Sequence, residues 1–120
     1  MKKMIVYLLI SFVMGCSQPQ LSYTDTAKIV VESFYKNDNT VLKKHTTPES
    51  YASFIAIQAM VAPENDNPSN FKLIEETVDG DIAWVKFSTS YEEKPETFKL
   101  VKADGQWKVA EKGLREQAPF

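Results

Sequence analysis

Phe98-Lys-Leu-Val-Lys-Ala-Asp-Gly-Gln-Trp-Lys-Val109 is the stretch of this 120-residue sequence that decides the fold. Apolar and charged residues alternate on both sides of Asp104-Gly105, a dipeptide that favours the tight turn of a two-residue β-hairpin. The alternation predicts two antiparallel strands, in which apolar residues of the first pair with Trp107 and Val109 of the second. The lysines predicted to face water are Lys99, Lys102, Lys108 and Lys112.

The same period of two begins earlier in the chain. Phe71 and Leu73 alternate with charged residues, and Asp79-Gly80 supplies a second turn of the kind that hairpins favour. Residues 82–91 form the strongest predicted strand, and the charged residues 92–96 are predicted to be the loop of the next hairpin. Together these segments predict a four-stranded antiparallel meander.

The residues before the meander have a helical period instead. The first predicted helix begins near Thr24 and ends at Asn37-Asp38-Asn39, and a second short helix covers residues 40–45. A third begins at Thr47-Pro48-Glu49 and stops at Pro63. The predicted inner stripe of this third helix is Tyr51, Phe54, Ile55, Gln58 and Val61. Helices followed by an antiparallel sheet make an α+β fold.

Three stretches, taken in their order, carry a resemblance to a known group. They are Ala27-Lys-Ile-Val-Val-Glu-Ser-Phe-Tyr35, Asp79-Gly-Asp-Ile-Ala-Trp-Val85 and the hairpin Phe98–Val109. In this order the chain resembles the small bacterial lipoprotein domains of unknown function in the NTF2-like (cystatin-like, lumazine-binding-like) superfamily. The resemblance implies a bent sheet wrapped around the helices into a cone whose mouth can hold a ligand. It implies no single chemistry, since superfamily members include isomerases, dehydratases, transport adaptors and secretion-system parts.

The beginning of the chain indicates export. An apolar run from Met4 to Met14 follows two lysines, and Gly15 stands directly before Cys16, the only cysteine. The run is shorter than the ~20 apolar residues of a transmembrane helix, so it predicts a signal peptide that is removed. Val13-Met14-Gly15-Cys16 resembles the bacterial lipobox, which implies cleavage after Gly15 and acyl chains on Cys16. The alternatives are an ordinary cleaved signal with an incidental cysteine and an uncleaved anchor.

The predicted organisation is a signal peptide at residues 1–15, a lipidated cysteine with a polar tether at 16–22, and one α+β domain at 23–120. Two or three acyl chains anchor a protein stably, at about 0.8 kcal/mol per buried methylene. We therefore expect a membrane-anchored lipoprotein of the bacterial cell envelope, on the periplasmic or surface face, and on the outer membrane in a Gram-negative cell. Removal of the signal leaves 12 basic and 16 acidic side chains, a net charge of −4 that argues against a nucleic-acid partner.

Candidates for catalysis and metal binding are few. His45, the only histidine, suits a general base near neutral pH, but it follows Lys43 and Lys44 at the end of a short helix, which favours a solvated role. The acids of turns and loops lack the spacing of a calcium loop. Glu75 and Glu76 are adjacent in a strand and so point to opposite faces. We therefore predict no catalytic residue, no metal site and no cofactor.

Three aromatic side chains, Tyr51, Trp84 and Tyr91, are candidates to line a pocket for an apolar or ring-shaped ligand. Aromatic residues of so small a domain also build its core, and this second interpretation stays open. The polar loop at residues 64–70 and the charged segment at 92–96 are candidates for a rim that faces a partner.

The first functional hypothesis is a non-enzymatic, lipid-anchored domain that binds an envelope protein or a small ligand, as an accessory subunit or a blocking factor. The second is an enzyme of the ketosteroid-isomerase-like kind, which would require a buried carboxylate or His45 inside the cone. The third is an exclusion or immunity lipoprotein that guards the surface of its host.

Overall fold

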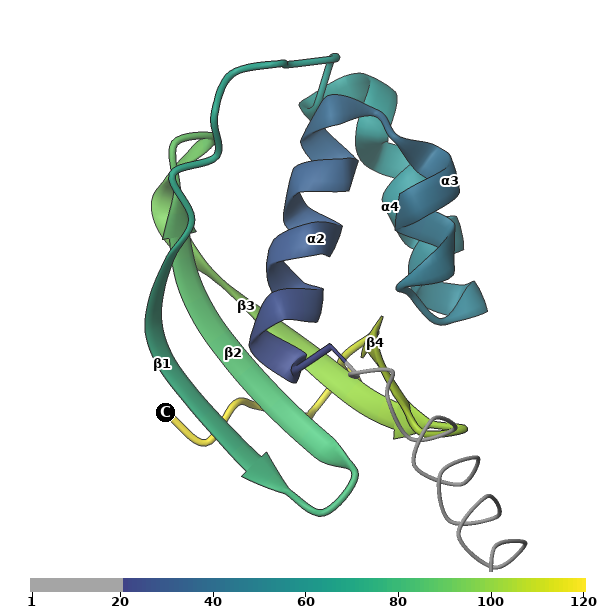
Figure 1. Ribbon diagram of the computed structural model, residues 1–120, viewed down its shortest axis with the longest axis vertical. Coiled ribbons are helices and arrows are strands. Elements are labelled where there is room, and N and C mark those ends of the chain that lie inside the picture. Colours follow the sequence, from purple (N-terminus) through teal and green to yellow (C-terminus); the bar gives the residue numbers. More distant parts are fainter. Residues whose placement is uncertain (1–20) are drawn as a thin grey trace, which may run out of the picture.

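The computed structural model describes residues 21–120, in which three helices precede four strands (Figure 1). The helices are α2 (Tyr23–Lys36), α3 (Asn39–Lys44) and α4 (Pro48–Val61), and the strands are β1 (Lys72–Asp79), β2 (Ile82–Thr89), β3 (Glu92–Ala103) and β4 (Gln106–Ala110). The predicted α+β class is confirmed. The predicted signal peptide, Cys16 and most of the predicted tether lie outside the described residues.

Helix α2 forms where its capping residues predict. The Asp25 N–H donates to Ser22 Oγ at 3.0 Å, which satisfies one backbone donor of the first turn. At the other end Asn37 adopts the left-handed conformation (φ 59°), and its backbone N–H donates to the Phe34 carbonyl. Between these caps the apolar side chains recur at helical spacing and bury one face. The buried apolar residues of α2 are Ala27, Val30, Val31, Phe34 and Tyr35.

The sheet is an antiparallel meander in the order β1-β2-β3-β4, and α2 lies across one of its faces (Figure 1). Alternation along β2 places Ala83, Val85 and Phe87 in the core with α2, where each is fully buried. Leu100 of β3 pairs with Val109 of β4, as the hairpin pattern predicts, whereas Trp107 pairs with Lys102 and not with an apolar residue. Gly80, Asp104 and Gly105 all have positive φ, as tight hairpin turns require.

Residues 92–96 are not a loop, which corrects the prediction for this segment. Strand β3 begins at Glu92, and the turn before it is at Ser90 and Tyr91. Tertiary contacts hold this start of the strand, because the Tyr35 hydroxyl donates to Glu92 at 2.9 Å and the Tyr35 ring stacks on Tyr91 at 4.5 Å. The β2–β3 register shifts between Phe87 and Thr89, where β3 contains Pro95.

The residues that follow β4 cross the face of the sheet opposite to α2 (Figure 1). Lys99 Nζ contacts the Glu116 carboxylate at 2.8 and 2.9 Å, so Lys99 does not simply face water as predicted. This C-terminal tail borders Trp84, which points away from the core face of β2 and is nevertheless only 8% exposed. The tail therefore shields a large aromatic side chain on the outer face of the sheet.

Within residues 21–120, no helix combines the length and the apolar character needed to cross a bilayer.

Candidate functional site

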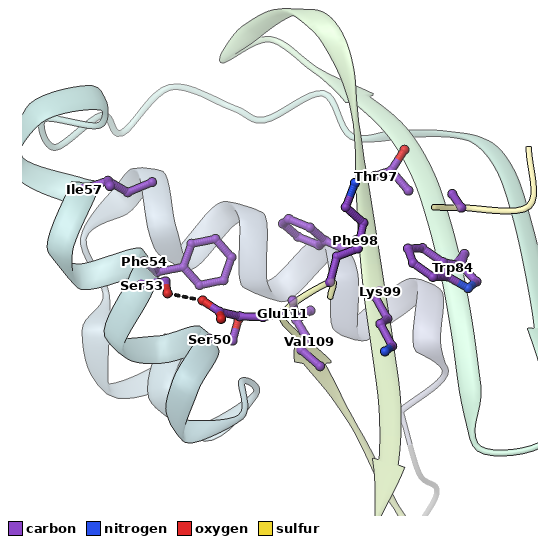
Figure 2. Close-up of a pocket in the computed structure, with 13 residues that line it drawn as sticks. Ser50, Ser53, Phe54, Ile57, Trp84, Thr97, Phe98, Lys99, Val109 and Glu111 are labelled. Carbon is purple, nitrogen blue, oxygen red and sulfur yellow. Dashed lines mark hydrogen bonds between the residues drawn. The ribbon is translucent and has the colours of Figure 1, made fainter. Parts of the chain in front are cut away.

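A cavity of about 560 Å³ opens between α4, the middle of β3 and the end of β4 (Figure 2). Its apolar lining includes Phe54 and Ile57 of α4 and Phe98 of β3. Its polar lining includes the two α4 serines and the two residues that flank Phe98 on β3. The lining residues labelled in Figure 2 are Ser50, Ser53, Phe54, Ile57, Trp84, Thr97, Phe98, Lys99, Val109 and Glu111.

Aromatic rings form the floor of this cavity. Phe54 of α4 meets Phe98 of β3 edge to face with ring centroids 6.0 Å apart, and Figure 2 shows the two side chains next to each other. Behind them, the ring centroid of Phe34 lies 5.2 Å from that of Phe54, and the ring centroid of Phe87 lies 5.0 Å from that of Phe98. Since these rings fill the space between the helices and the sheet, the cavity lies along the outside of the aromatic core.

The cavity exists because β4 is much shorter than β3. The β3–β4 register ends where Lys99 pairs with Ala110, and the chain then leaves the sheet at Glu111. Among the described strands, nothing pairs with the β4 side of residues 92–98 of β3. This segment, called the free edge below, forms one wall of the cavity.

Helix α4 forms the opposite wall and carries no charge from Ser50 to Val61. Much of its apolar surface is exposed, with Met60 79%, Val61 51% and Ile57 46% accessible. Val61 is thus not part of the inner stripe as predicted, and Ala62, which is buried, takes its place. The helix turns a face of Ala52, Ala56, Ile57, Ala59, Met60 and Val61 to the outside, and we call this face the apolar face of α4.

Two charged side chains that line the cavity, Lys99 and Glu111, are held by hydrogen bonds. The Ser53 hydroxyl donates to the Glu111 carboxylate across the cavity mouth, as the dashed line in Figure 2 marks. Lys99 is bound to Glu116 of the tail, and this hydrogen bond together with one from the Gly113 N–H lowers the pKa of Glu116. Such pairing suits a binding surface better than an acid–base pair that must exchange protons.

Of the three aromatic residues proposed as pocket residues, Trp84 lines the cavity. Tyr51 lies instead under Lys43, whose Nζ is 5.9 Å from the ring centroid. Tyr91 stacks on Tyr35, and its hydroxyl donates to the Asn67 carbonyl at 2.8 Å. The structure therefore does not bring the three together. The sequence patterns predicted Phe54 and Phe98 as core residues and not as pocket residues. Both pack against the core and also form the floor of the cavity.

His45 lies outside the cavity and has a structural role. It caps the C-terminus of α3, and its carbonyl accepts a hydrogen bond from the Val109 N–H at 2.9 Å. Burial, reinforced by Lys44 and Lys108, lowers the pKa of its imidazole, which is therefore neutral at pH 7.

Glu96 is a residue that the sequence interpretation missed. It pairs with Phe87 on the core face of the sheet, and its Oε2 is buried without a hydrogen-bond partner among the described residues. Burial, with a smaller contribution from Glu92, raises the pKa of this carboxyl to about 7. The inward orientation of Glu96 follows from the spacing of Glu96, Phe98 and Leu100. Alternate residues of a strand share one face, so all three point to the core once residues 92–96 are assigned to the strand.

No three histidine, cysteine or acidic side chains gather into a metal-binding group in the part of the chain that the structure describes.

The comparisons with known proteins bear on the fold. No protein-family model matches the sequence, and no curated protein matches it. A structure from Campylobacter jejuni, for which the name NTF2-like transpeptidase has been proposed, superposes with a TM-score of 0.57 at 17% identity, over 74% of this chain and 97% of that one. An NTF2-like protein of unknown function from Silicibacter pomeroyi superposes with a TM-score of 0.56 at 16% identity, over 72% of this chain and 87% of that one. The likeness at these identities is one of fold, and this chain shares the α+β fold of these NTF2-like proteins.

Proposed function

We propose that this protein is a lipid-anchored component of the bacterial cell envelope, whose NTF2-like domain binds a partner protein and performs no catalysis. The observation that carries the proposal is the apolar face of α4 beside an open cavity. A helix that is apolar all round is usually covered on all sides. Contiguous exposed apolar surface on a folded domain marks an interaction site.

The size of this surface favours a protein over a small molecule as the occupant. Ile57 belongs both to the cavity lining and to the exposed helix face, so the two surfaces are continuous. From Ile57 the apolar face runs to Met60 and Val61 at the end of α4, beyond the cavity itself. A small ligand in the cavity would leave this end of the helix in water, whereas a protein would cover both.

The anchoring part of the proposal rests on the sequence Val13-Met14-Gly15-Cys16. We expect Cys16→Ala to abolish incorporation of labelled palmitate and to release the protein from the membrane fraction, because acyl chains supply the membrane affinity. Ser17→Ala is the matched control and should keep the label. Persistent label in Cys16→Ala would show that the cysteine is not the acylation site.

One observation favours a second candidate, the ketosteroid-isomerase-like enzyme. Glu96 is an inward-facing carboxyl with a raised pKa, as a general acid or base of that kind requires. However, Glu96 is not among the residues that line the cavity, and aromatic rings occupy the interior beside it. Glu96 thus lies outside the cavity in which a ligand would bind, and the exposed apolar surface favours binding of a partner over catalysis.

Site-specific photocrosslinking in living cells tests the proposal. A photoreactive amino acid at Ile57 should capture one dominant envelope protein, whereas the same group at Glu75, on the opposite edge strand β1, should not. Equal capture from both positions, or none from either, would argue against a protein-binding role for the α4 side of the domain.

A further inference from the structure

The backbone of the free edge is oriented for pairing with another strand. The Lys102 N–H donates to the Asp81 carbonyl at 2.8 Å, so the backbone of Lys102 points toward the β2 side. Successive residues of a strand direct their N–H and C=O groups to alternate sides, and the β2–β3 register is regular from Val101 to Glu96. Thr97 therefore directs its backbone groups to the β4 side, beyond the last β3–β4 pair, where an added strand would meet them.

The space beside Thr97 has the form of a groove. The free edge of β3 lies on one side and α4 on the other, with the Phe54–Phe98 contact as the floor between them (Figure 2). An extended segment laid along this groove would continue the line of β4. Because side chains of a strand alternate in direction, every second one would point at Ile57 and Phe98 while the others pointed to solvent.

The charges around the groove favour a basic partner. Residues 92–98 contain three glutamates and one lysine, a net charge of −2, whereas α4 is uncharged from Ser50 to Val61. Two of the three glutamates, Glu92 and Glu93, are exposed, so this segment favours a basic partner over an acidic one.

We propose that this groove accepts an extended, basic segment of the partner protein, which adds to β3 at Thr97 as a new edge strand. Its apolar side chains pack on Ile57 and Phe98, and its lysines or arginines lie along the acidic segment 92–98 of β3. Strand addition at a free edge is a general mode of peptide recognition, in which the backbone provides affinity and alternate side chains provide specificity. The inference rests on the proposed function and names the kind of segment that the domain recognises.

The test uses the full-length protein in non-ionic detergent and three fluorescent peptides of equal length: alternating lysine and valine, alternating glutamate and valine, and a scrambled lysine–valine sequence without alternation. Fluorescence anisotropy gives each dissociation constant. We expect the alternating basic peptide to bind at least about tenfold more tightly than either of the others, which corresponds to the loss of one or two good interactions. Absence of binding by this peptide, or equal binding of all three, would overturn the proposal.

Two variants locate the peptide on β3. Thr97→Pro removes the outward N–H at a position where an edge strand tolerates proline, and should weaken binding by about tenfold, whereas Thr97→Ala should not. Glu93→Gln, at an exposed position of the same segment, should weaken binding of the basic peptide by at least about threefold and leave the acidic peptide unchanged. In the unmodified protein, hydrogen exchange of residues 92–98 should slow on peptide binding, a readout that does not depend on how well Thr97→Pro folds. Protection elsewhere would overturn the assignment.

Other occupants give distinct results. Concentration-dependent dimerisation that Thr97→Pro abolishes would identify a second copy of this chain as the added strand and would overturn the proposal of a basic partner. Continued crosslinking from Ile57 to the same envelope protein in Thr97→Pro would disprove strand addition while leaving the proposed function intact. If the photoreactive group at Ile57 captures no specific protein even when Thr97 is unchanged, the result would instead argue against the proposed function itself.

Discussion

Glu96 holds a buried carboxylate oxygen that the domain does not satisfy with a hydrogen bond from any described residue. Burying a charge without a partner disfavours the charged form, and the nearby Glu92 adds to this effect. The same environment raises the pKa of the Tyr35 hydroxyl, through burial first and then the charges of Glu96 and Glu92. The charged form of Glu96, at this end of β3, therefore destabilises the folded domain at neutral pH.

We predict that the stability of the domain depends on pH through Glu96. Its pKa is about 7 in the folded state against an ordinary value of 4.5, so the folded state holds the proton more tightly than the unfolded state. The stabilisation is fully present below about pH 4.5 and is lost as the pH rises through 7. Glu96→Gln should therefore raise the melting temperature at pH 8 and have little effect at pH 4.5.

Glu93→Gln, at an exposed position of the same strand, is the control for this prediction and should change the melting temperature equally at both pH values. A difference between Glu96→Gln and the unmodified protein that is constant from pH 4.5 to 8 would show that Glu96 titrates normally.

Trp107 and Phe87 provide a second prediction at the residue scale. Trp107 is only partly buried and packs edge-on against Tyr23 at 5.4 Å, whereas Phe87 is fully buried. We expect Phe87→Ala to cost about 3–5 kcal/mol and Trp107→Ala about 2 kcal/mol, because the cost grows with the cavity that is left. Urea denaturation measures both. A larger loss in Trp107→Ala than in Phe87→Ala would contradict the burial seen here.

At the scale of elements, the arrangement of α4 against α2 depends on a polar contact where both helices end. Asn37 caps α2, and its side-chain Nδ2 donates to the Ala62 carbonyl at the end of α4 at 3.0 Å. Gln58 adds a second link, since its Nε2 donates to the Phe34 carbonyl at 2.9 Å. These bonds hold α4 by its buried side and leave its apolar face directed outward.

Two substitutions of Asn37 should separate its backbone and side-chain roles. Asn37→Gly keeps the left-handed conformation and loses the side-chain hydrogen bonds, of which the one to Ala62 is the shortest, and this should cost about 1 kcal/mol. Asn37→Ala loses the same bonds and also strains the backbone at φ 59°, and should cost about 2 kcal/mol. Chemical denaturation gives the two free energies of unfolding. Equal losses would mean that the backbone conformation contributes nothing.

At the scale of the whole molecule, the C-terminal tail closes the outer face of the sheet. A second cavity, of about 380 Å³, lies on this face between Trp84 and the tail residues Glu116, Gln117 and Pro119. The tail is held by the ion pair from Lys99 and has few other polar contacts among the described residues. Trp84 therefore reports on whether the tail is in place.

Removal of residues 113–120 should expose Trp84 without unfolding the domain, because the core lies on the other face of the sheet. In a Trp107→Phe background, where Trp84 is the only tryptophan, the emission maximum should shift to longer wavelength and acrylamide quenching should increase. Leu114→Ala, at a fully exposed position of the tail, is the control and should change neither. Unchanged emission after truncation would show that the tail does not cover Trp84.

The local sequence by itself determined the elements of this protein. Ser22, Thr47 and Pro48 mark helix starts, and Asp79-Gly80 and Asp104-Gly105 mark turns, because caps and tight turns use backbone groups only a few residues apart. The periods of 3.6 and of 2 then predicted the order of helices and strands. These features sufficed for the α+β class and for the NTF2-like resemblance.

The tertiary structure alone decided the site. Residues 92–96 read as a charged loop, yet contacts from Tyr35 extend them into β3 and thereby create the free edge. Val61 fits the helical stripe of α4 and is nevertheless exposed, because the other elements cover only part of that helix. Trp84 is buried by a tail that follows it by some thirty residues. In each case the deciding contact joins residues far apart in the chain, and local period and turn chemistry contain no information about it.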